Sequence, residues 1–336
     1  MTTTTDYSIL SEKYRPQTLD EVMGQEHIMP RFRGYAKNKT CPNMLFSGDP
    51  GTGKTTIAKC LAREIFGKNW KDSFYALNAS DERKLETIRG KVKNAARAIP
   101  AEQDFKIIFL DEADSLAPLA QPALRTIIED YSDICRFILS CNYPNKIIDP
   151  IADRLVPFRF RHLEPIDAKL MLDKVVEEEE ISIDKSALML LAVLSDGSMR
   201  RALNILCSFK MASIDNISEA QIYEAFYWVD DVYIKNLVIA TISGNLDIVN
   251  KKVNDLLNKK CYTHKEIFDS LDRVIREGNI PVGTKLEILP KIADVEFRIS
   301  MGASENIQLK YLMVFLIRVF AKYKKREAEC VKKETP

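Results

Sequence analysis

A phosphate-binding sequence lies in the first part of the chain. Residues 43–56 read NMLFSGDPGTGKTT and place Gly48, Gly53, Lys54 and Thr55 in the pattern GxxxxGK[ST]. The glycines of this pattern let backbone N–H groups curve around phosphates at the N-terminus of a helix. We therefore expect Lys54 to reach the β- and γ-phosphates of a nucleotide, and the Thr55 hydroxyl to bind Mg²⁺. A glycine-rich turn with a surface lysine is the simpler alternative, but the apolar run before the pattern and the helical pattern TIAKCLAREIF after it favour the nucleotide site.

A pair of carboxylates follows a second apolar run. KIIFLDE places Asp111 and Glu112 at the expected C-terminal end of a strand, the edge at which open α/β sheets bind ligands. Asp111 is predicted to support Mg²⁺, and Glu112 to polarise the attacking water as a base. Such a pair is often only a strand that ends in solvent. Together with the upstream GKT it becomes a strong prediction of ATP hydrolysis.

The same stretch, LDEADS at 110–115, also matches a helicase signature. A DEAD-box helicase requires a second sheet-containing ATPase-like domain. Up to about residue 163, short apolar runs at 43–47, 74–79, 105–110, 135–140 and 156–160 alternate with helical patterns, which predicts an α/β fold with a parallel sheet covered on both faces. From Glu164 onward apolar residues recur only at helical spacing, so the second half is predicted to be all helical and the helicase reading is disfavoured.

Length and composition set the remaining limits. The 336 residues are 46% hydrophobic and 29% charged, which suits two or three globular domains, and we expect a break near Asp230 and Asp231. The seven cysteines form no CxxC pair and there are only three histidines, so a structural zinc site is not expected. No secretory signal and no apolar run of about 20 residues are seen, which predicts an intracellular protein without a membrane partner. The net charge of +1 means that any nucleic-acid binding must come from a local basic face.

Several motifs occur together in one order: EKYRP (12–16), GDPGTGKTT (48–56), ALNASDER (76–83), FLDEAD (109–114), LSCNY (139–143) and GSMRRALN (197–204). In this the chain resembles the small subunits of replication factor C, over nearly its whole length and including EFRISMGASENIQL (296–309). That family consists of AAA+ clamp loaders, which use ATP to open a ring-shaped sliding clamp and place it on primer-template DNA.

The resemblance implies an AAA+ nucleotide-binding domain (1–163), a helical lid (164–230), a helical collar for oligomerisation (231–330) and a basic tail (331–336). It implies ATP and Mg²⁺ as cofactors. The implied partners are a large subunit and other small subunits, in a pentamer, with the clamp and DNA. The setting would be the nucleus in a eukaryote, and the cytoplasm or nucleoid in an archaeal or viral system.

The resemblance also assigns roles at the nucleotide. Tyr14, Arg15 and Pro16 resemble the adenine-binding segment, which would otherwise read as a surface turn. Asn142 resembles sensor 1, which holds the attacking water or the γ-phosphate; a strand-end Asn that closes a turn is the alternative. Arg200 resembles sensor 2, a guanidinium that reaches the γ-phosphate from the lid, although it could be part of a basic helix face. The full set expected to contact the nucleotide is Tyr14, Arg15, Pro16, Gly48, Asp49, Pro50, Gly51, Thr52, Gly53, Lys54, Thr55, Thr56, Asn142 and Arg200.

Two departures from the family pattern are visible. The usual Ser-Arg-Cys is here Asp153-Arg154-Leu155, and the usual ALRR is Ala123-Leu124-Arg125-Thr126. The resemblance implies that Arg154 acts as a finger on the ATP of the adjacent subunit, in which it stabilises the transition state. Asp153 could instead pair with Arg154 and hold it back. We expect Arg154 to act in trans nevertheless.

Contacts with DNA and clamp are implied at two further places. Arg83, Arg89 and Lys146 resemble DNA-tracking residues, with a solvated basic face as an even alternative. SLAPLAQ (115–121) corresponds to the clamp-binding surface and presents Leu116, Pro118 and Leu119 before a helix expected to start near Pro122. These apolar residues could also lie in the core of the domain.

Three other functions compete with clamp loading as explanations of this sequence. An AAA+ protein remodeller would need an aromatic pore loop, but the segment between the GKT helix and the DEAD strand reads NASDERKLETIRGKVKNAARAIPAEQ. A branch-migration motor would be revealed by duplex unwinding. A scaffold that binds ATP without hydrolysing it is disfavoured by the presence of Lys54, Asp111, Glu112 and Asn142.

Overall fold

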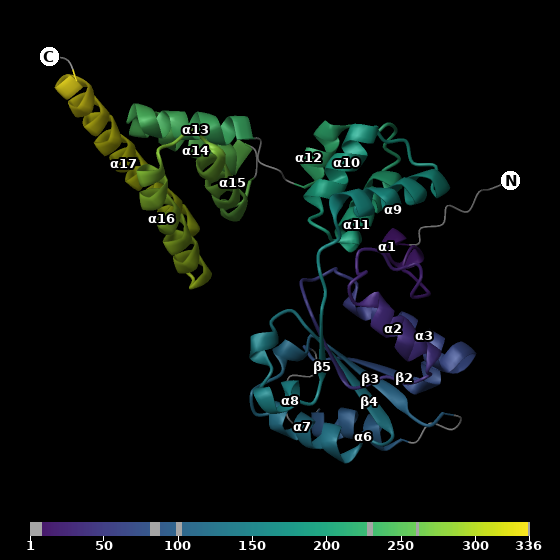
Figure 1. The fold of residues 1–336 in the computed structure, drawn as a ribbon. Helices are drawn as coiled ribbons and strands as arrows, with labels where there is room; N and C mark the ends of the chain where they lie inside the picture. Colours follow the sequence, from purple (N-terminus) through teal and green to yellow (C-terminus); the bar gives the residue numbers. More distant parts are fainter. Residues whose placement is uncertain (1–8, 81–87, 99–102, 227–230, 260–261, 335–336) are drawn as a thin grey trace. The chain divides into compact units, whose positions relative to one another are not determined.

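The computed structural model describes residues 9–80, 88–98, 103–226, 231–259 and 262–334 (Figure 1). Contacts divide the chain into two compact units, Met1–Ile222 and Tyr223–Pro336. Each unit is described by itself. The predicted division at residues 163, 230 and 330 stays a prediction, because a division by contacts says nothing about function.

The first unit contains a five-stranded parallel sheet in the order β2-β3-β4-β1-β5. The strands are β1 (Met44–Ser47), β2 (Phe74–Asn78), β3 (Lys106–Asp111), β4 (Cys135–Cys141) and β5 (Val156–Arg159). The three central strands are almost continuously buried, as expected when helices cover both faces of a parallel sheet. The predicted α/β fold is therefore confirmed, and each strand lies within a residue or two of its predicted position.

Helices on the two faces of the sheet form separate cores (Figure 1). One face packs against α2 (Met29–Lys37) and α3 (Lys54–Phe66), with Phe32, Ile57 and Leu61 fully buried. The other face packs against α6 (Lys93–Arg97), α7 (Gln121–Asp130) and α8 (Asp149–Ala152). A short helix, α4 (Trp70–Ser73), leads into β2. These layers fix the carboxyl ends of β1, β3 and β4 at one edge of the sheet.

A group of helices follows the sheet within the first unit and is called the lid here. It consists of α9 (Pro165–Glu178), α10 (Lys185–Leu194), α11 (Met199–Met211) and α12 (Glu219–Ala225). Apolar residues at helical spacing, such as Leu172, Leu191 and Leu206, are fully buried between these helices. Ser198 begins α11 as its N-cap and accepts a hydrogen bond from the backbone N–H of Arg201. The short helix α1 (Leu10–Lys13) lies against α11 (Figure 1).

The second unit is helical throughout its described residues. Its helices are α13 (Asp231–Ser243), α14 (Leu246–Asn254), a π-helical turn (Asp255–Lys259), α15 (His264–Glu277), α16 (Val282–Ser300) and α17 (Glu305–Glu334). Thr263 and Glu266 form a capping box that fixes the start of α15. The prediction of a helical second half is confirmed, with one isolated bridge between Ile183 and Ile217 in the lid as its departure. Several large apolar side chains stay exposed along α16 and at its C-cap, among them Val282, Leu286, Phe297 and the cap residue Met301.

Within the described ranges, every helix is too short or too polar to cross a bilayer. The same residues contain no group of three or more His, Cys, Asp or Glu side chains that could hold a metal ion by themselves. Five of the seven cysteines have side chains that the structure describes, and all five are free and buried: Cys41, Cys60, Cys135, Cys141 and Cys207.

Candidate nucleotide-binding site

The phosphate loop, residues 48–55, joins β1 to α3 and brings three predicted groups together. Gly53 caps α3 in the left-handed region, with φ of 95°. Lys54 is 8% exposed, and its Nζ donates to the backbone oxygens of Gly48 at 2.5 Å and Asp49 at 2.9 Å, and to Oδ1 of Asn142 at 3.0 Å. Burial lowers the pKa of Lys54 below its ordinary value, and the carboxylate of Asp111 opposes this change. The ammonium is thus held at the loop that would cradle phosphates.

Oxygen ligands for a cation meet beside this loop. The Thr55 hydroxyl donates to Oδ2 of Asp111 over 2.9 Å, so a hydroxyl at the start of α3 and a carboxylate at the end of β3 share one position. Hard oxygen donors of this kind suit Mg²⁺, which usually takes only one or two protein groups in addition to phosphates and water. The residues present therefore fit the predicted metal.

Glu112 occupies an uncommon backbone conformation directly after β3. Its φ is 53° and its ψ is 40°, in the left-handed region that residues other than glycine seldom adopt, and its side chain is exposed. The backbone N–H of Glu112 donates to Oδ1 of Asp111 at 3.1 Å. Strain of this sort costs on the order of 1–3 kcal/mol and is often found at functional sites. The turn separates the two carboxylates: Asp111 accepts the hydrogen bond from the Thr55 hydroxyl, whereas the side chain of Glu112 faces solvent.

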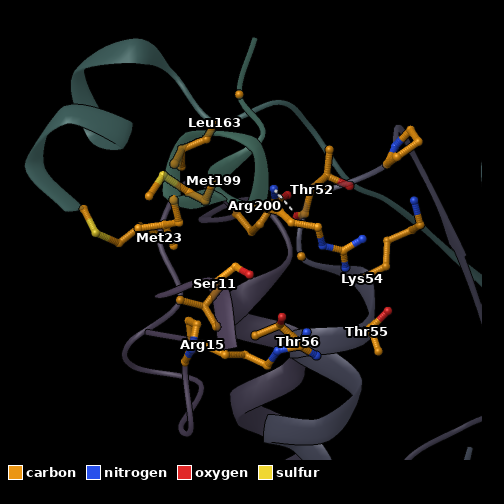
Figure 2. A pocket seen from close by; sticks show the side chains of 18 of the residues that line it. Ser11, Arg15, Met23, Thr52, Lys54, Thr55, Thr56, Leu163, Met199 and Arg200 are labelled. Carbon is orange, nitrogen blue, oxygen red and sulfur yellow. Dashed lines mark hydrogen bonds between the residues drawn. The ribbon is translucent and has the colours of Figure 1, made fainter. Parts of the chain in front are cut away.

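The lid contributes the opposite wall of the pocket. Figure 2 shows Arg200 and Met199, in the first turn of α11, entering the pocket that Lys54, Thr55 and Thr56 line from below. The phosphate loop touches the lid at Gly51, where φ is 85° and an added Cβ would lie 2.3 Å from Oγ of Ser198. Glycine suits this position, because the positive φ strains other residues and a Cβ would push against the Ser198 hydroxyl that caps α11.

The far end of the same pocket suits a base. Tyr14, Arg15 and Pro16, the predicted adenine-binding segment, line the pocket here. Apolar side chains from the rest of the unit complete it: Val22, Met23, Leu163, Met171, Met199 and Leu203. Cationic, aromatic and apolar groups at one end and a phosphate loop at the other match the two halves of a nucleotide.

Gln25 was not predicted from the sequence. It is 2% exposed, and its amide donates to the backbone oxygen of Arg161 at 2.8 Å and accepts from the N–H of Arg161 at 3.2 Å. It also reaches the backbone oxygen of Thr52 at 3.4 Å. Gln25 therefore joins the phosphate loop to the segment that leads into the lid. No local pattern marks it, since all its partners are distant in sequence.

His162 makes a second such connection, between the phosphate loop and the lid. Its Nε2 lies 2.6 Å from Oδ2 of Asp49, and its Nδ1 lies 2.5 Å from the backbone oxygen of Asp196. The hydrogen bond with the Asp49 carboxylate, and then the one with the Asp196 carbonyl, raise the pKa of His162 above its ordinary value. Both ring nitrogens can donate only in the imidazolium form, so protonation strengthens this bridge.

A pH-dependent stability follows from the raised pKa of His162. A group whose pKa is higher in the folded chain stabilises it fully below the unfolded pKa of about 6.5, and this contribution is lost as the pH rises through the folded pKa. We expect the difference in Tm between the wild type and His162→Gln to be largest below about pH 6.5 and to shrink as the pH rises through the raised pKa of folded His162. The effect is small because the ring is 43% exposed.

The control for this measurement is His27→Gln. His27 is also exposed, but its ring bonds the backbone carbonyl of Arg159. The Tm of this variant, measured over the same pH range, serves as the reference for replacing an exposed histidine by glutamine. A Tm difference for His162→Gln that does not change with pH would contradict the bridge.

Arg154 does not pair with Asp153, which was the alternative to its expected action in trans. The guanidinium forms an ion pair with Glu129 of α7, and its Nη1 donates to the backbone oxygen of Pro150 at 2.6 Å. Asp153 is the adjacent residue at the end of α8, and side chains of adjacent residues on a helix point apart. Glu129 also accepts from Nε of Arg125 at 3.0 Å, and these hydrogen bonds hold the pKa of Glu129 below its ordinary value.

The predicted clamp segment divides into buried and exposed residues. Leu116 is only 4% exposed and belongs to the core beneath α7, which corrects the expectation that it faces a partner: its side chain fills the space between the sheet and that helix. Pro118 is exposed, and Leu119 is 80% exposed. The helix begins at Gln121, one residue before the predicted Pro122.

The predicted DNA contacts can be located only in part. Lys146 is exposed, and its Nζ lies over the ring of Tyr143 at 4.7 Å. Arg83 lies outside the described residues, and so does the side chain of Arg89. These positions stay predictions.

Comparison with known proteins decides the family. The model of the "ATPase family associated with various cellular activities (AAA)" matches residues 44–162, that of the "DNA polymerase III clamp loader subunit, ATPase lid domain" matches 168–206, and that of the "Replication factor C C-terminal domain" matches 229–314. A replication factor C small subunit from Methanococcus vannielii is 41% identical over 303 residues, covering 90% of this chain and 96% of that protein. One from Archaeoglobus fulgidus is 40% identical, covering 93% and 98%. The chain belongs to the replication factor C small-subunit family.

Solved structures agree on the fold of this replication factor C small subunit. The Thermotoga maritima RuvB Holliday junction branch migration motor is similar with a TM-score of 0.53 and 16% identity, over 77% of this chain and 85% of that one. At this identity the likeness extends to the fold alone. The family instead makes this chain an ATPase of the clamp-loader class, in accord with the pocket around Lys54.

Proposed function

We propose that this clamp-loader ATPase binds Mg²⁺ and ATP in the pocket around Lys54 and uses hydrolysis to open a sliding clamp and load it onto primer-template DNA. The observation that carries the proposal is the convergence of Lys54, Asn142 and the Thr55–Asp111 pair at one edge of the sheet. In the proposed division, residues 1–163 bind the nucleotide, 164–230 form the lid, 231–330 form the collar and 331–336 form the tail.

Each side chain then has a distinct task. Lys54, once released from the loop carbonyls that it now contacts, would neutralise charge on the β- and γ-phosphates. The amide of Asn142 would hold the attacking water or the γ-phosphate, and Glu112 would take a proton from that water. Thr55 and Asp111 would hold Mg²⁺, which supplies charge neutralisation at the phosphates when bound. Arg200 would bind the γ-phosphate from the lid.

Assembly into a pentamer with a large subunit and other small subunits is part of the same proposal. The exposed apolar side chains of α16, with Ile307 and Tyr311 of α17, give the second unit a surface suited to contact between subunits.

An ATPase assay on the isolated chain and on the complex with its co-purifying partners tests this function. We expect clamp and primed DNA together to raise the ATPase rate of the complex, and neither of them to change the ATPase rate of the isolated chain. Migration of a four-way junction by the complex, without a response to clamp, would favour the branch-migration motor instead.

Lys146 is expected to contact a DNA phosphate. Lys146→Glu should weaken DNA-stimulated hydrolysis and reduce the slope of log affinity against log salt by about one. The control is Lys37→Glu. Lys37 is an exposed lysine at the end of α2, and this helix packs on the opposite face of the sheet from Lys146. An unchanged slope for Lys146→Glu would remove this residue from the DNA surface.

Leu119 is expected to bind the clamp. Leu119→Asp should lower the affinity for the clamp about tenfold or more, because exposed apolar anchors dominate such contacts. Circular dichroism should stay unchanged, since the side chain is 80% exposed. Ile166→Asp in α9 is a matched control, with a side chain that is 69% exposed. Full clamp binding by Leu119→Asp would exclude this segment as the docking site.

A further inference from the structure

A buried carboxylate lies behind the base end of the pocket. The side chain of Glu179, directly after α9, is only 4% exposed. Its Oε1 accepts from the hydroxyl of Tyr14 at 2.6 Å and lies 2.8 Å from Nζ of Lys13, and its Oε2 pairs with Nζ of Lys210. Three donors from two distant segments thus converge on one side chain.

These hydrogen bonds keep Glu179 charged. Burial alone would raise its pKa, but the bonds from Lys13, Lys210 and Tyr14 outweigh burial and lower the pKa to about 2. The pKa of Tyr14 is raised, first by burial and then by its bond to this carboxylate, so the phenol keeps its proton. The contacts of Glu179 with Lys13, Tyr14 and Lys210 are called the joint here. Removing one partner of such a buried charge leaves the others uncompensated, so the joint resists opening.

The joint connects two parts of the nucleotide pocket. Lys13 and Tyr14 lie in the segment that forms the base wall, with α1 packed on α11. Lys210 lies in the last turn of α11, whereas Arg200 lies in its first turn. At 1.5 Å per residue these two positions are about 15 Å apart on one rigid helix. A rigid-body shift of α11 that moves both of its ends therefore moves Arg200 together with the anchor of Tyr14, or breaks the bonds to Glu179.

We propose that Glu179 is a positioning residue that ties the base wall to the lid helix α11, so that recognition of the base and placement of Arg200 on the γ-phosphate are energetically coupled. The inference rests on the proposed function in that Tyr14 lines the site of the base. Glu179 itself touches no nucleotide in this scheme. It acts through Tyr14 and Lys13 on one side and Lys210 on the other.

A double-mutant cycle on ATP affinity tests the coupling. Changes this far apart, without shared partners, normally add. Arg200→Ala lowers ATP affinity by some factor in the wild type. We expect that factor to be at least threefold smaller when the same change is made in a Glu179→Gln chain. Glu179→Gln should also weaken the binding of ATP more than the binding of inorganic tripolyphosphate, a probe that has no base. Tyr14→Phe, which keeps the ring but removes the hydroxyl, should show the same coupling to Arg200 if Glu179→Gln fails to fold.

Two controls separate the possible outcomes. Glu177→Gln, an exposed change two residues away in α9, should be additive with Arg200→Ala. Additivity for both Glu179→Gln and Tyr14→Phe would overturn the inference, as would equal losses of ATP and tripolyphosphate affinity. Lys54→Ala should abolish ATP binding; unchanged binding in that variant would overturn the proposed function itself.

Discussion

Arg154→Ala is expected to lower the ATPase rate of the assembled loader by about 10³-fold or more, and to leave the rate of the isolated chain unchanged. An arginine supplied in trans stabilises charge that develops on the transferred phosphoryl group, and effects of 10³–10⁵ are typical of such residues. In the chain by itself the guanidinium is paired with Glu129, at the surface, with 35% of the side chain exposed. A contact of this exposure is weak and can be exchanged for a phosphate.

Steady-state hydrolysis with clamp and primed DNA measures the effect of Arg154→Ala. Two variants act as controls. Glu129→Gln removes the present partner but keeps the guanidinium, and Arg125→Ala removes the other cation on Glu129. Both are expected to change the rate far less than Arg154→Ala does. If hydrolysis by the complex survived Arg154→Ala, the finger would have to be another residue.

Glu112→Gln is expected to reduce kcat by about 10²- to 10⁴-fold, the range for loss of a general base, which corresponds to roughly 3–5 kcal/mol of transition-state stabilisation. ATP binding is expected to persist, because Lys54, Thr55 and Asp111 are untouched. A fluorescent ATP analogue and single-turnover hydrolysis separate the two steps.

Lys54→Ala is the contrasting variant for Glu112→Gln, since it should lose affinity as well as turnover. Rapid hydrolysis by Glu112→Gln would show that another group, such as Asn142 with a chain of waters, activates the nucleophile. The exposed, left-handed turn at Glu112 would then have a purely structural origin.

The parts of this molecule that sequence could predict are those set by local patterns. Lys54, Thr55 and Asp111 stand in short motifs beside strands, and parallel topology brings strand ends together at one edge. Near-continuous apolar runs located the three central strands, because parallel strands covered on both faces have no polar face. The edge strands β2 and β5 are more exposed, and their apolar residues gave a weaker signal.

The remaining contacts depend on pairs of residues far apart in sequence. Asp49 meets His162, Tyr14 meets Glu179 and Arg154 meets Glu129. The first residue of each pair stands in a recognised motif, but no local pattern marks its partner. The same reason explains why Leu116 looked like a docking residue. The sequence pattern of an apolar loop residue is the same whether the residue is covered by the core of its own domain or by a partner. Only the packing of Leu116 beneath α7 distinguishes the core residue from a docking residue.

The contact between Gly51 and Ser198 has a practical use. An alanine at position 51 would place a methyl group against the hydroxyl that caps α11, and so act as a wedge between loop and lid. Such a chain could still be produced and assembled, yet its lid would be held away from the phosphates. Gly51→Ala would thus offer a way to trap the loader in an open form for structural study, without changing any charged group at the site.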